Sequence, residues 1–201
     1  MDAKTWDEKY RAAERLWSEG PNLFVADRLG PATPGKGLDL ACGEGRNAVW
    51  LAEQGWEMTG VDFSEVALER GREQSDAVEW VHGDARTWEP PSGTRYDLVL
   101  IAYLQIPQPD LEKVVRRAAT WLTSGGEIFL IGHDKSNLEH GHGGPQVPEV
   151  LWDVDTIVAW LDGLEIVEAQ VVRRPVETDD GIVYARDTLV RARASHGREP
   201  V

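Results

Sequence analysis

The chain has 201 residues and a formal net charge of -14, and 41% of its residues are hydrophobic and 28% charged. This length and composition are typical of one globular domain, or of one domain with an added subdomain. A surface this acidic repels the phosphates of a nucleic acid as a whole, which disfavours nucleic-acid partners and favours a small-molecule substrate.

The sequence also bears on membrane association and compartment. It contains no apolar run long enough to span a bilayer, and residues 1–17 are charged throughout rather than apolar, so we expect neither a membrane helix nor a secretory leader. Cys42 is the single cysteine and cannot form an internal disulfide. We therefore expect a reducing, cytoplasmic location. The sequence leaves the oligomeric state open.

The first 36 residues are expected to form a helical cap or lid. Trp6, Tyr10, Ala13 and Trp17 are spaced as one face of a helix over residues 5–19. A second short helix is expected over 23–29, and a loop rich in Gly and Pro follows over 30–37.

From residue 37 onward, apolar strand patterns alternate with helical patterns. This alternation predicts a parallel sheet with helices on both faces. The turn "TSGG" is expected to precede the fifth strand. The expected strands are 37–41, 57–62, 77–84, 95–104 and 127–133, and the expected helices are 46–54, 64–74 and 110–122.

The pattern changes in the last quarter of the chain. A helix is expected over 153–163, and two long strands over 164–176 and 181–194 are joined by the turn signal "ETDD". The predicted fold is therefore α/β, a Rossmann-like, mostly parallel sheet of seven strands that ends in an antiparallel hairpin. We expect the main domain over 37–194 and a flexible tail over 195–201.

The stretch "LDLACGEGRN" predicts a ligand site where the first strand ends. Gly43 and Gly45 allow the backbone to approach a ligand closely, and the following helix directs its N-terminus to the same place. Asp62 and Asp84 follow the second and third strands, where carboxylates can accept hydrogen bonds from ribose hydroxyls and from an adenine amino group. Together these residues predict a nucleoside-binding site.

Asp39 distinguishes two kinds of nucleoside cofactor. The letters "GEGRNA" match the G-x-G-x-x-A pattern of dinucleotide-binding folds, so an NAD(P)-dependent oxidoreductase is one reading. A carboxylate beside the glycine turn repels a pyrophosphate, however, and attracts a ligand that carries an ammonium and a sulfonium. Asp39 thus favours S-adenosylmethionine.

These motifs resemble those of class I S-adenosylmethionine-dependent methyltransferases, in particular the tellurite-resistance and thiopurine methyltransferase-like subgroup. "LDLACGEGRN" resembles the family's first motif, "GVDFS" its ribose motif and "HGDAR" its adenine motif. Ala41 departs from the pattern, because a glycine usually stands there. The resemblance implies a cofactor site formed by Asp39, Ala41, Gly43, Gly45, Asn47, Asp62, Phe63, Asp84, Ala85, Ala102 and Tyr103, capped by Tyr10, Trp17 and Asn22.

The resemblance also implies methyl transfer to a small molecule by in-line displacement. The acceptor could be a thiol, a metalloid oxyanion, a small amine or a phenol, and a general base is needed only for a hydroxyl or a protonated amine. Tyr103 and His133 are candidate catalytic residues by position. The glycine-rich loop 133–148 holds His133, His140 and His142, which we expect to face water rather than a metal. A non-catalytic protein of the same fold is a third hypothesis.

Overall fold

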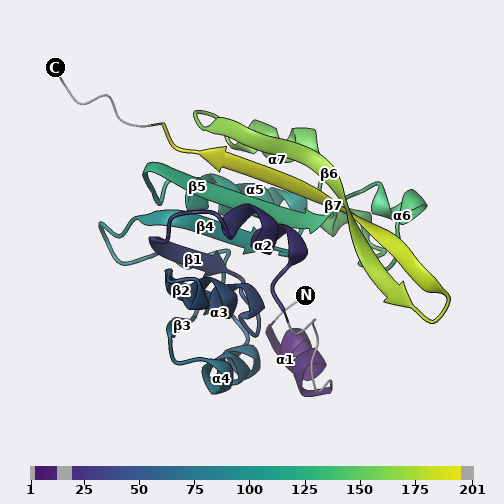
Figure 1. Ribbon diagram of the computed structural model, residues 1–201, viewed down its shortest axis with the longest axis horizontal. Helices are drawn as coiled ribbons and strands as arrows, with labels where there is room; N and C mark the ends of the chain where they lie inside the picture. The colour runs from purple at the N-terminus through teal and green to yellow at the C-terminus, as the bar shows by residue number, and fades with distance from the viewer. Residues whose placement is uncertain (1–2, 13–19, 196–201) are drawn as a thin grey trace. The chain divides into compact units, whose positions relative to one another are not determined.

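The computed structural model describes residues 3–12 and 20–195 (Figure 1). Internal contacts divide the chain into two compact units, residues 1–100 and 101–201, and each is described by itself. The strand order of the sheet is β3-β2-β1-β4-β5-β7-β6, which confirms the predicted seven-stranded α/β fold. The expected division at residue 36 stays a prediction.

The first unit is built on parallel strands. Strands β1 (Lys36–Leu40), β2 (Glu57–Asp62) and β3 (Val78–His82) pair in parallel, and β1 also pairs in parallel with β4 (Tyr96–Ala102). Strand β1 is buried along almost its whole length, as expected for a strand covered on both faces. Its apolar side chains therefore form the centre of this unit's core.

Four helices accompany these strands in the described part of the unit. Helices α1 (Ala3–Ala12) and α2 (Leu23–Leu29) precede the sheet, while α3 (Arg46–Glu53) and α4 (Glu65–Gln74) connect its strands. The Ser64 hydroxyl accepts the Ala67 N–H and caps α4, as the sequence predicted. Each connecting helix thus begins directly after the loop that follows a strand.

The second unit contains the antiparallel part of the sheet. Strand β5 (Leu122–His133) pairs antiparallel with β7 (Gly181–Arg193), and β7 pairs antiparallel with β6 (Glu165–Thr178). Helices α5 (Gln108–Ala119) and α7 (Val154–Trp160) pack on one another and on these strands. The predicted C-terminal hairpin is therefore confirmed.

Two local predictions in this unit are wrong. The letters "TSGG" were expected to form a turn, but these residues lie inside β5. Gly125 adopts a φ of 77°, its N–H donates to Ala194 O at 3.1 Å, and the Ala194 N–H returns a bond to Gly126 O. The loop over 133–148 also contains a short helix, α6 (Asn137–His140), and a 3-10 turn (Pro148–Val150) follows it.

Candidate functional site

The turn after β1 has an unusual backbone that brings several N–H groups together. Ala41, Gly43 and Gly45 have φ values of 64°, 58° and 78°, which lie in the left-handed region. Ala41 therefore adopts a conformation that favours glycine, at the position where the family pattern has one. The N–H groups of Ala41 and Cys42 both donate to Val61 O, at 2.8 and 3.0 Å, so the turn is tied to β2.

Gly45 has a second reason to lack a side chain. A Cβ atom at this position would lie 2.1 Å from the ring of Trp80, which also lies against Gly60 and Gly71. Trp80 donates its indole N–H to Ser75 O at 2.9 Å, which fixes the ring. Part of the glycine pattern therefore serves packing of the turn, β2 and α4 against Trp80 of β3, and is not a signal for a ligand alone.

Asp62 is both a structural and a candidate binding residue. It is buried at the end of β2, and its carboxylate accepts the Gly43 N–H and the Ser64 N–H, each at 2.8 Å. Burial raises the pKa of Asp62, and the backbone hydrogen bonds from Ser64 and Gly43 partly offset this. Because each carboxylate oxygen can accept more than one bond, Asp62 has capacity left for ribose hydroxyls.

Asp39 is the unusual group of the first unit. Its side chain is only 1% exposed, and neither carboxylate oxygen has a partner of hydrogen-bond geometry among the described residues. Burial, followed by the nearby charge of Asp62, raises the pKa of Asp39 to about 7, and Arg46 and the Ala48 N–H lower it by less. A buried carboxylate without a partner is costly, and a cationic ligand would supply one.

Asn22 and Asn47 hold the cap of the first unit together. The backbone N–H of Asn22 donates to Asn47 Oδ1 at 2.8 Å. The Asn22 side chain accepts the N–H groups of Phe24 and Val25, which caps α2. The structure therefore gives both residues a structural role that the sequence analysis did not predict, although Asn directly before "LFVADRL" is an N-cap signal.

The adenine-side candidates lie after β2 and β3. The Asp84 side chain is 30% exposed and forms a bidentate ion pair with Arg86, whose backbone N–H it also accepts. His82 Nε2 lies 3.0 Å from Phe63 O and links the two loops. Ala85 is buried. Contacts of Asp84, Ala85 and Phe63 with adenine stay predictions.

The lid candidates are only partly described. Tyr10 is buried in α1, with its ring 5.9 Å from the ring of Trp6. Helix α1 contacts α4, where Ser64 Oγ donates to Asp7 Oδ1 at 2.5 Å. Trp17 lies outside the described residues. The single thiol, Cys42, has a pKa well above its ordinary value because of burial and the charges of Asp39 and Asp62.

The second unit brings together the two candidate catalytic residues. Tyr103 follows Ala102 at the end of β4 and has a φ of 57°, an uncommon conformation for a non-glycine residue. His133 ends β5, and the rings of Tyr103 and His133 lie 4.9 Å apart. His133 is buried rather than facing water, which corrects that expectation, whereas His140 and His142 are exposed.

The metal alternative gains no support from this loop. Asp134 is buried, and it accepts hydrogen bonds from Ser136 and from the Thr188 hydroxyl. In residues 3–12 and 20–195, no group of three or more His, Cys, Asp or Glu side chains is arranged to hold a metal ion.

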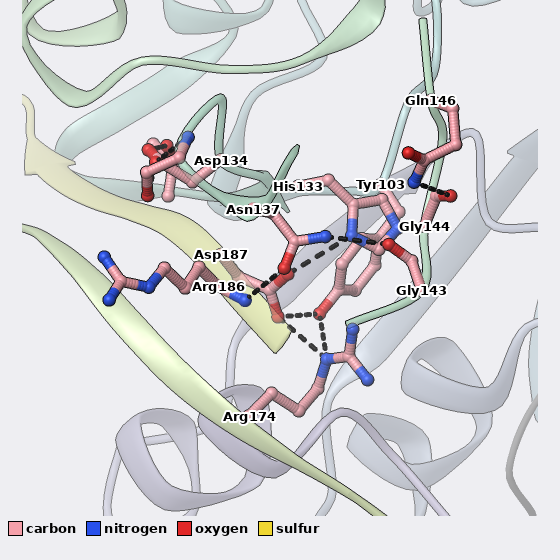
Figure 2. A network of polar contacts seen from close by, with 12 residues as sticks. Tyr103, His133, Asp134, Asn137, Gly143, Gly144, Gln146, Arg174, Arg186 and Asp187 are labelled. Atoms are coloured by element: carbon pink, nitrogen blue, oxygen red, sulfur yellow. Dashed lines mark hydrogen bonds and ion pairs between the residues drawn. The ribbon is translucent and has the colours of Figure 1, made fainter. Parts of the chain in front are cut away.

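Sequence reasoning missed two residues beside Tyr103 and His133, namely Arg174 and Asp187. The Tyr103 hydroxyl donates to Asp187 Oδ2 at 2.8 Å, and Arg174 Nε donates to the same oxygen at 2.8 Å (Figure 2). The available signal was a charged residue inside the apolar strand pattern "YARDTLV", because a charge buried in a strand requires a partner.

Comparisons with known proteins agree with this architecture. Residues 38–126 match the family model described as a methyltransferase domain. The ubiquinone biosynthesis O-methyltransferases of Escherichia coli O7:K1 and Citrobacter koseri are each 30% identical over 111 residues, which are 53% of this chain and 46% of theirs. The chain thus matches about half the length of these curated relatives.

Solved structures resemble almost the whole chain at low identity. TehB from Haemophilus influenzae has a TM-score of 0.71 and 16% identity, over 96% of this chain and 68% of that one. The N-methyltransferase NodS from Bradyrhizobium japonicum, solved with S-adenosyl-L-homocysteine, has a TM-score of 0.72 and 17% identity, over 96% and 99%. At these identities the likeness establishes the fold. Among the described residues, no helix has the length and hydrophobicity that crossing a membrane requires.

Proposed function

We propose that the protein transfers a methyl group from S-adenosylmethionine to a small-molecule acceptor, which the match of residues 38–126 to the methyltransferase domain family and the seven-stranded α/β sheet support. The single observation that carries this proposal within the structure is Asp39. Its buried carboxylate has no hydrogen-bond partner among the described residues, and it stands on the strand that leads into the glycine turn. The methionine part of the cofactor carries the positive charge that this carboxylate requires.

The residues present fit this cofactor. Asp62 would accept the ribose hydroxyls, because it is already fixed by the N–H groups of Gly43 and Ser64. Asp39 would hold the cationic end, and Asp84, with Phe63 and Ala85, would contact the adenine. When bound, S-adenosylmethionine supplies an activated methyl group. The chain's own part is to align the acceptor and exclude water.

The alternative cofactor is disfavoured by the same carboxylate. A dinucleotide would place its pyrophosphate at the glycine turn, where Asp39 would repel it. The family match also supports a methyltransferase over an NAD(P)-dependent oxidoreductase. A protein that retains the fold without activity would bind the cofactor and methylate nothing.

Partner and compartment are part of the proposal. The net charge of -14 supports a small acceptor rather than a nucleic acid. The lone cysteine supports a cytoplasmic location.

The test is calorimetric titration of the chain with S-adenosylmethionine, S-adenosylhomocysteine and NADH. We expect the first two to bind and NADH not to bind. Asp62→Ala should weaken cofactor binding by about a hundredfold or more, because it removes an ionised acceptor from the ribose hydroxyls. Asp76→Ala, which changes an exposed carboxylate of the same unit, should leave binding unchanged.

Asp62 also holds two backbone N–H groups, so thermal unfolding must show that the variant is folded. Asp62→Asn, which keeps one acceptor oxygen, should show an intermediate loss. Binding of NADH alone, or wild-type affinity in folded Asp62→Ala, would contradict the proposal.

A further inference from the structure

Four side chains of the second unit converge at the end of β5, and we call Tyr103, His133, Arg174 and Asp187 the Asp187 cluster (Figure 2). His133 and Asp187 are direct cross-strand partners of the antiparallel pair β5–β7, and cross-strand partners point to the same face. Arg174 on β6 is the partner of Ala185, two residues before Asp187, so it shares this face. Strand register therefore fixes His133, Arg174 and Asp187, and the Tyr103 hydroxyl joins them through its hydrogen bond to Asp187.

Asp187 is the fixed anion of the cluster. It is fully buried, and its Oδ2 atom accepts hydrogen bonds from the Tyr103 hydroxyl and from Arg174 Nε. Burial raises the pKa of Asp187, but His133, Arg174 and Tyr103 together lower it below its ordinary value. Asp187 is thus ionised at neutral pH, and its second oxygen, Oδ1, is left for another partner.

The His133 imidazole is the group that faces this oxygen. His133 Nδ1 lies 3.4 Å from Asp187 Oδ1, within ion-pair distance, and among the described residues neither atom has a partner of hydrogen-bond geometry. A carboxylate can only accept, so it favours the neutral tautomer in which Nδ1 carries the proton. Nε2 then has a free lone pair, and it makes no hydrogen bond to any described residue.

The surroundings hold this ring in place. Gly144 lies so close that a Cβ atom there would be 3.0 Å from His133 Nδ1. The loop that carries Gly144 is tied down by Asn137, whose Nδ2 donates to Gly143 O and whose Oδ1 accepts the Arg186 N–H. Tyr103 keeps its left-handed backbone beside the ring. Strained residues of this kind concentrate at functional sites.

We propose that His133 is a general base positioned by Asp187, and that the methyl acceptor is therefore a hydroxyl compound. The inference rests on the proposed methyltransferase function. A thiolate or metalloid anion attacks a methyl group without losing a proton, so it would not need this arrangement. A neutral hydroxyl needs a base in reach of its proton.

The proton and electron balance of the step is simple. The acceptor oxygen forms the new C–O bond with one of its lone pairs, and the sulfur of the cofactor keeps the electron pair of the broken C–S bond. The hydroxyl proton passes to His133 Nε2 and later to solvent. Asp187 stays ionised throughout, and its charge stabilises the imidazolium.

The first test needs no acceptor. Long-range 1H–15N NMR of the ¹⁵N-His-labelled chain distinguishes the two imidazole tautomers, and His133→Gln assigns the signal. We expect the Nδ1–H tautomer in the wild type and its loss in Asp187→Asn, because the amide of Asn can present a donor to Nδ1. An Nε2–H tautomer in the wild type would overturn the proposal, as would an unchanged tautomer in folded Asp187→Asn.

The second test compares matched acceptors. Phenol, catechol and 4-hydroxybenzoate provide hydroxyls, while thiophenol and 4-mercaptobenzoate provide thiolates. We expect the wild type to methylate a hydroxyl compound and His133→Gln to lower kcat on it by about a hundredfold or more. Methylation of the matching thiol, and the affinity for S-adenosylhomocysteine, should be unchanged. His142→Gln, an exposed histidine of the same loop, is the control.

The outcomes separate this inference from the proposed function. No binding of S-adenosylmethionine by the wild type would refute the function itself. A wild type that binds it but methylates only thiols, or none of the hydroxyl compounds, would overturn the inference alone. Equal losses on hydroxyl and thiol acceptors in His133→Gln would do the same, because a base serves only the hydroxyl.

Discussion

Each unit has one aspartate that is at most 1% exposed, Asp39 in the first and Asp187 in the second, and the two carboxyl groups have opposite pKa shifts. Asp39 is 1% exposed and has a pKa of about 7, whereas Asp187 is fully buried and has a pKa below its ordinary value. In both cases burial is the largest single influence and raises the pKa. The difference therefore comes from partners: Tyr103 and Arg174 donate hydrogen bonds to Asp187 and His133 lies beside it, whereas no described residue has hydrogen-bond geometry to the Asp39 carboxylate.

This comparison separates two uses of a buried charge. The charge of Asp187 is balanced within the chain, so it can hold Tyr103, His133 and Arg174 in fixed positions without a ligand. The Asp39 carboxylate receives no hydrogen bond from the described residues, and Arg46 offsets its burial only in part, so the unit that contains it becomes more stable when a cation binds. A paired carboxylate is a structural or positioning element, and an unpaired one points to a ligand.

The largest expected effect comes from removing Asp187, the buried carboxylate that has partners. Asp187→Ala removes a hydrogen-bond acceptor from Tyr103 and leaves the partly buried Arg174 without its counter-ion, so we expect a loss of about 4 kcal/mol in the free energy of unfolding. Urea unfolding at pH 7 measures this loss. Asp162→Ala, an exposed aspartate of the same unit, should change stability little.

The pH dependence of this difference follows from the lowered pKa of Asp187. A carboxyl whose pKa is lower in the folded state stabilises the fold above the ordinary pKa of 3.8, and this contribution is lost as pH falls through the folded value. The gap between wild type and Asp187→Ala should therefore narrow on acidification. A gap no larger than that of Asp162→Ala at pH 7 would contradict the pairing.

The second prediction concerns Asp39, and here the effect of the substitution on stability has the opposite sign. A carboxyl whose pKa is raised from 3.8 to about 7 binds a proton in the folded state over that interval, so stability falls as pH rises through it. Asp39→Asn removes this pH-dependent loss of stability, because the amide of Asn does not titrate. Without cofactor we expect the variant to be more stable than the wild type by about 3 kcal/mol at pH 8 and nearly equal to it at pH 4.

Urea unfolding of both proteins at the two pH values gives this difference directly. Asp76→Asn serves as the control, because this aspartate is exposed and its carboxylate stays in water when the protein folds. A variant that is less stable than the wild type at pH 8 would show that Asp39 is paired after all.

The comparison also shows what the sequence could predict. The alternation of strand and helix patterns was sufficient to predict the fold, because the spacing of apolar residues within each segment indicates its type. Asp39 could be predicted to meet a cation, since it stands in a strand directly before a glycine turn. The structure adds that its carboxylate has no partner within the described part of the chain, which no local pattern could reveal.

The paired aspartate was not predicted, because its partners come from distant strands. Tyr103 and Asp187 are 84 residues apart, and their contact depends on which strands neighbour one another and in what register. The pairing of Gly125 and Gly126 with Ala194, which turns an expected turn into strand, has the same origin. Local composition gives element types, while long-range pairing decides which polar groups meet.

The smallest expected effect is the release of a proton from Asp39 when the cofactor binds. A cation bound at Asp39 favours the ionised carboxylate, so cofactor binding should release the proton that the free protein holds. At pH 7 this release should amount to about half a proton, because the pKa of Asp39 is about 7. Affinity for S-adenosylmethionine should therefore rise with pH up to this value and level off above it.

Calorimetry in two buffers with different ionisation enthalpies measures the released proton. Asp39→Asn should show no such release at Asp39 and a weaker affinity that no longer follows this titration. Asp187 contributes nothing to this release, because it is already ionised and cannot release a proton near pH 7. Equal proton release in wild type and Asp39→Asn would mean that another group titrates on binding, and that the unpaired carboxylate does not meet the cofactor's positive charge.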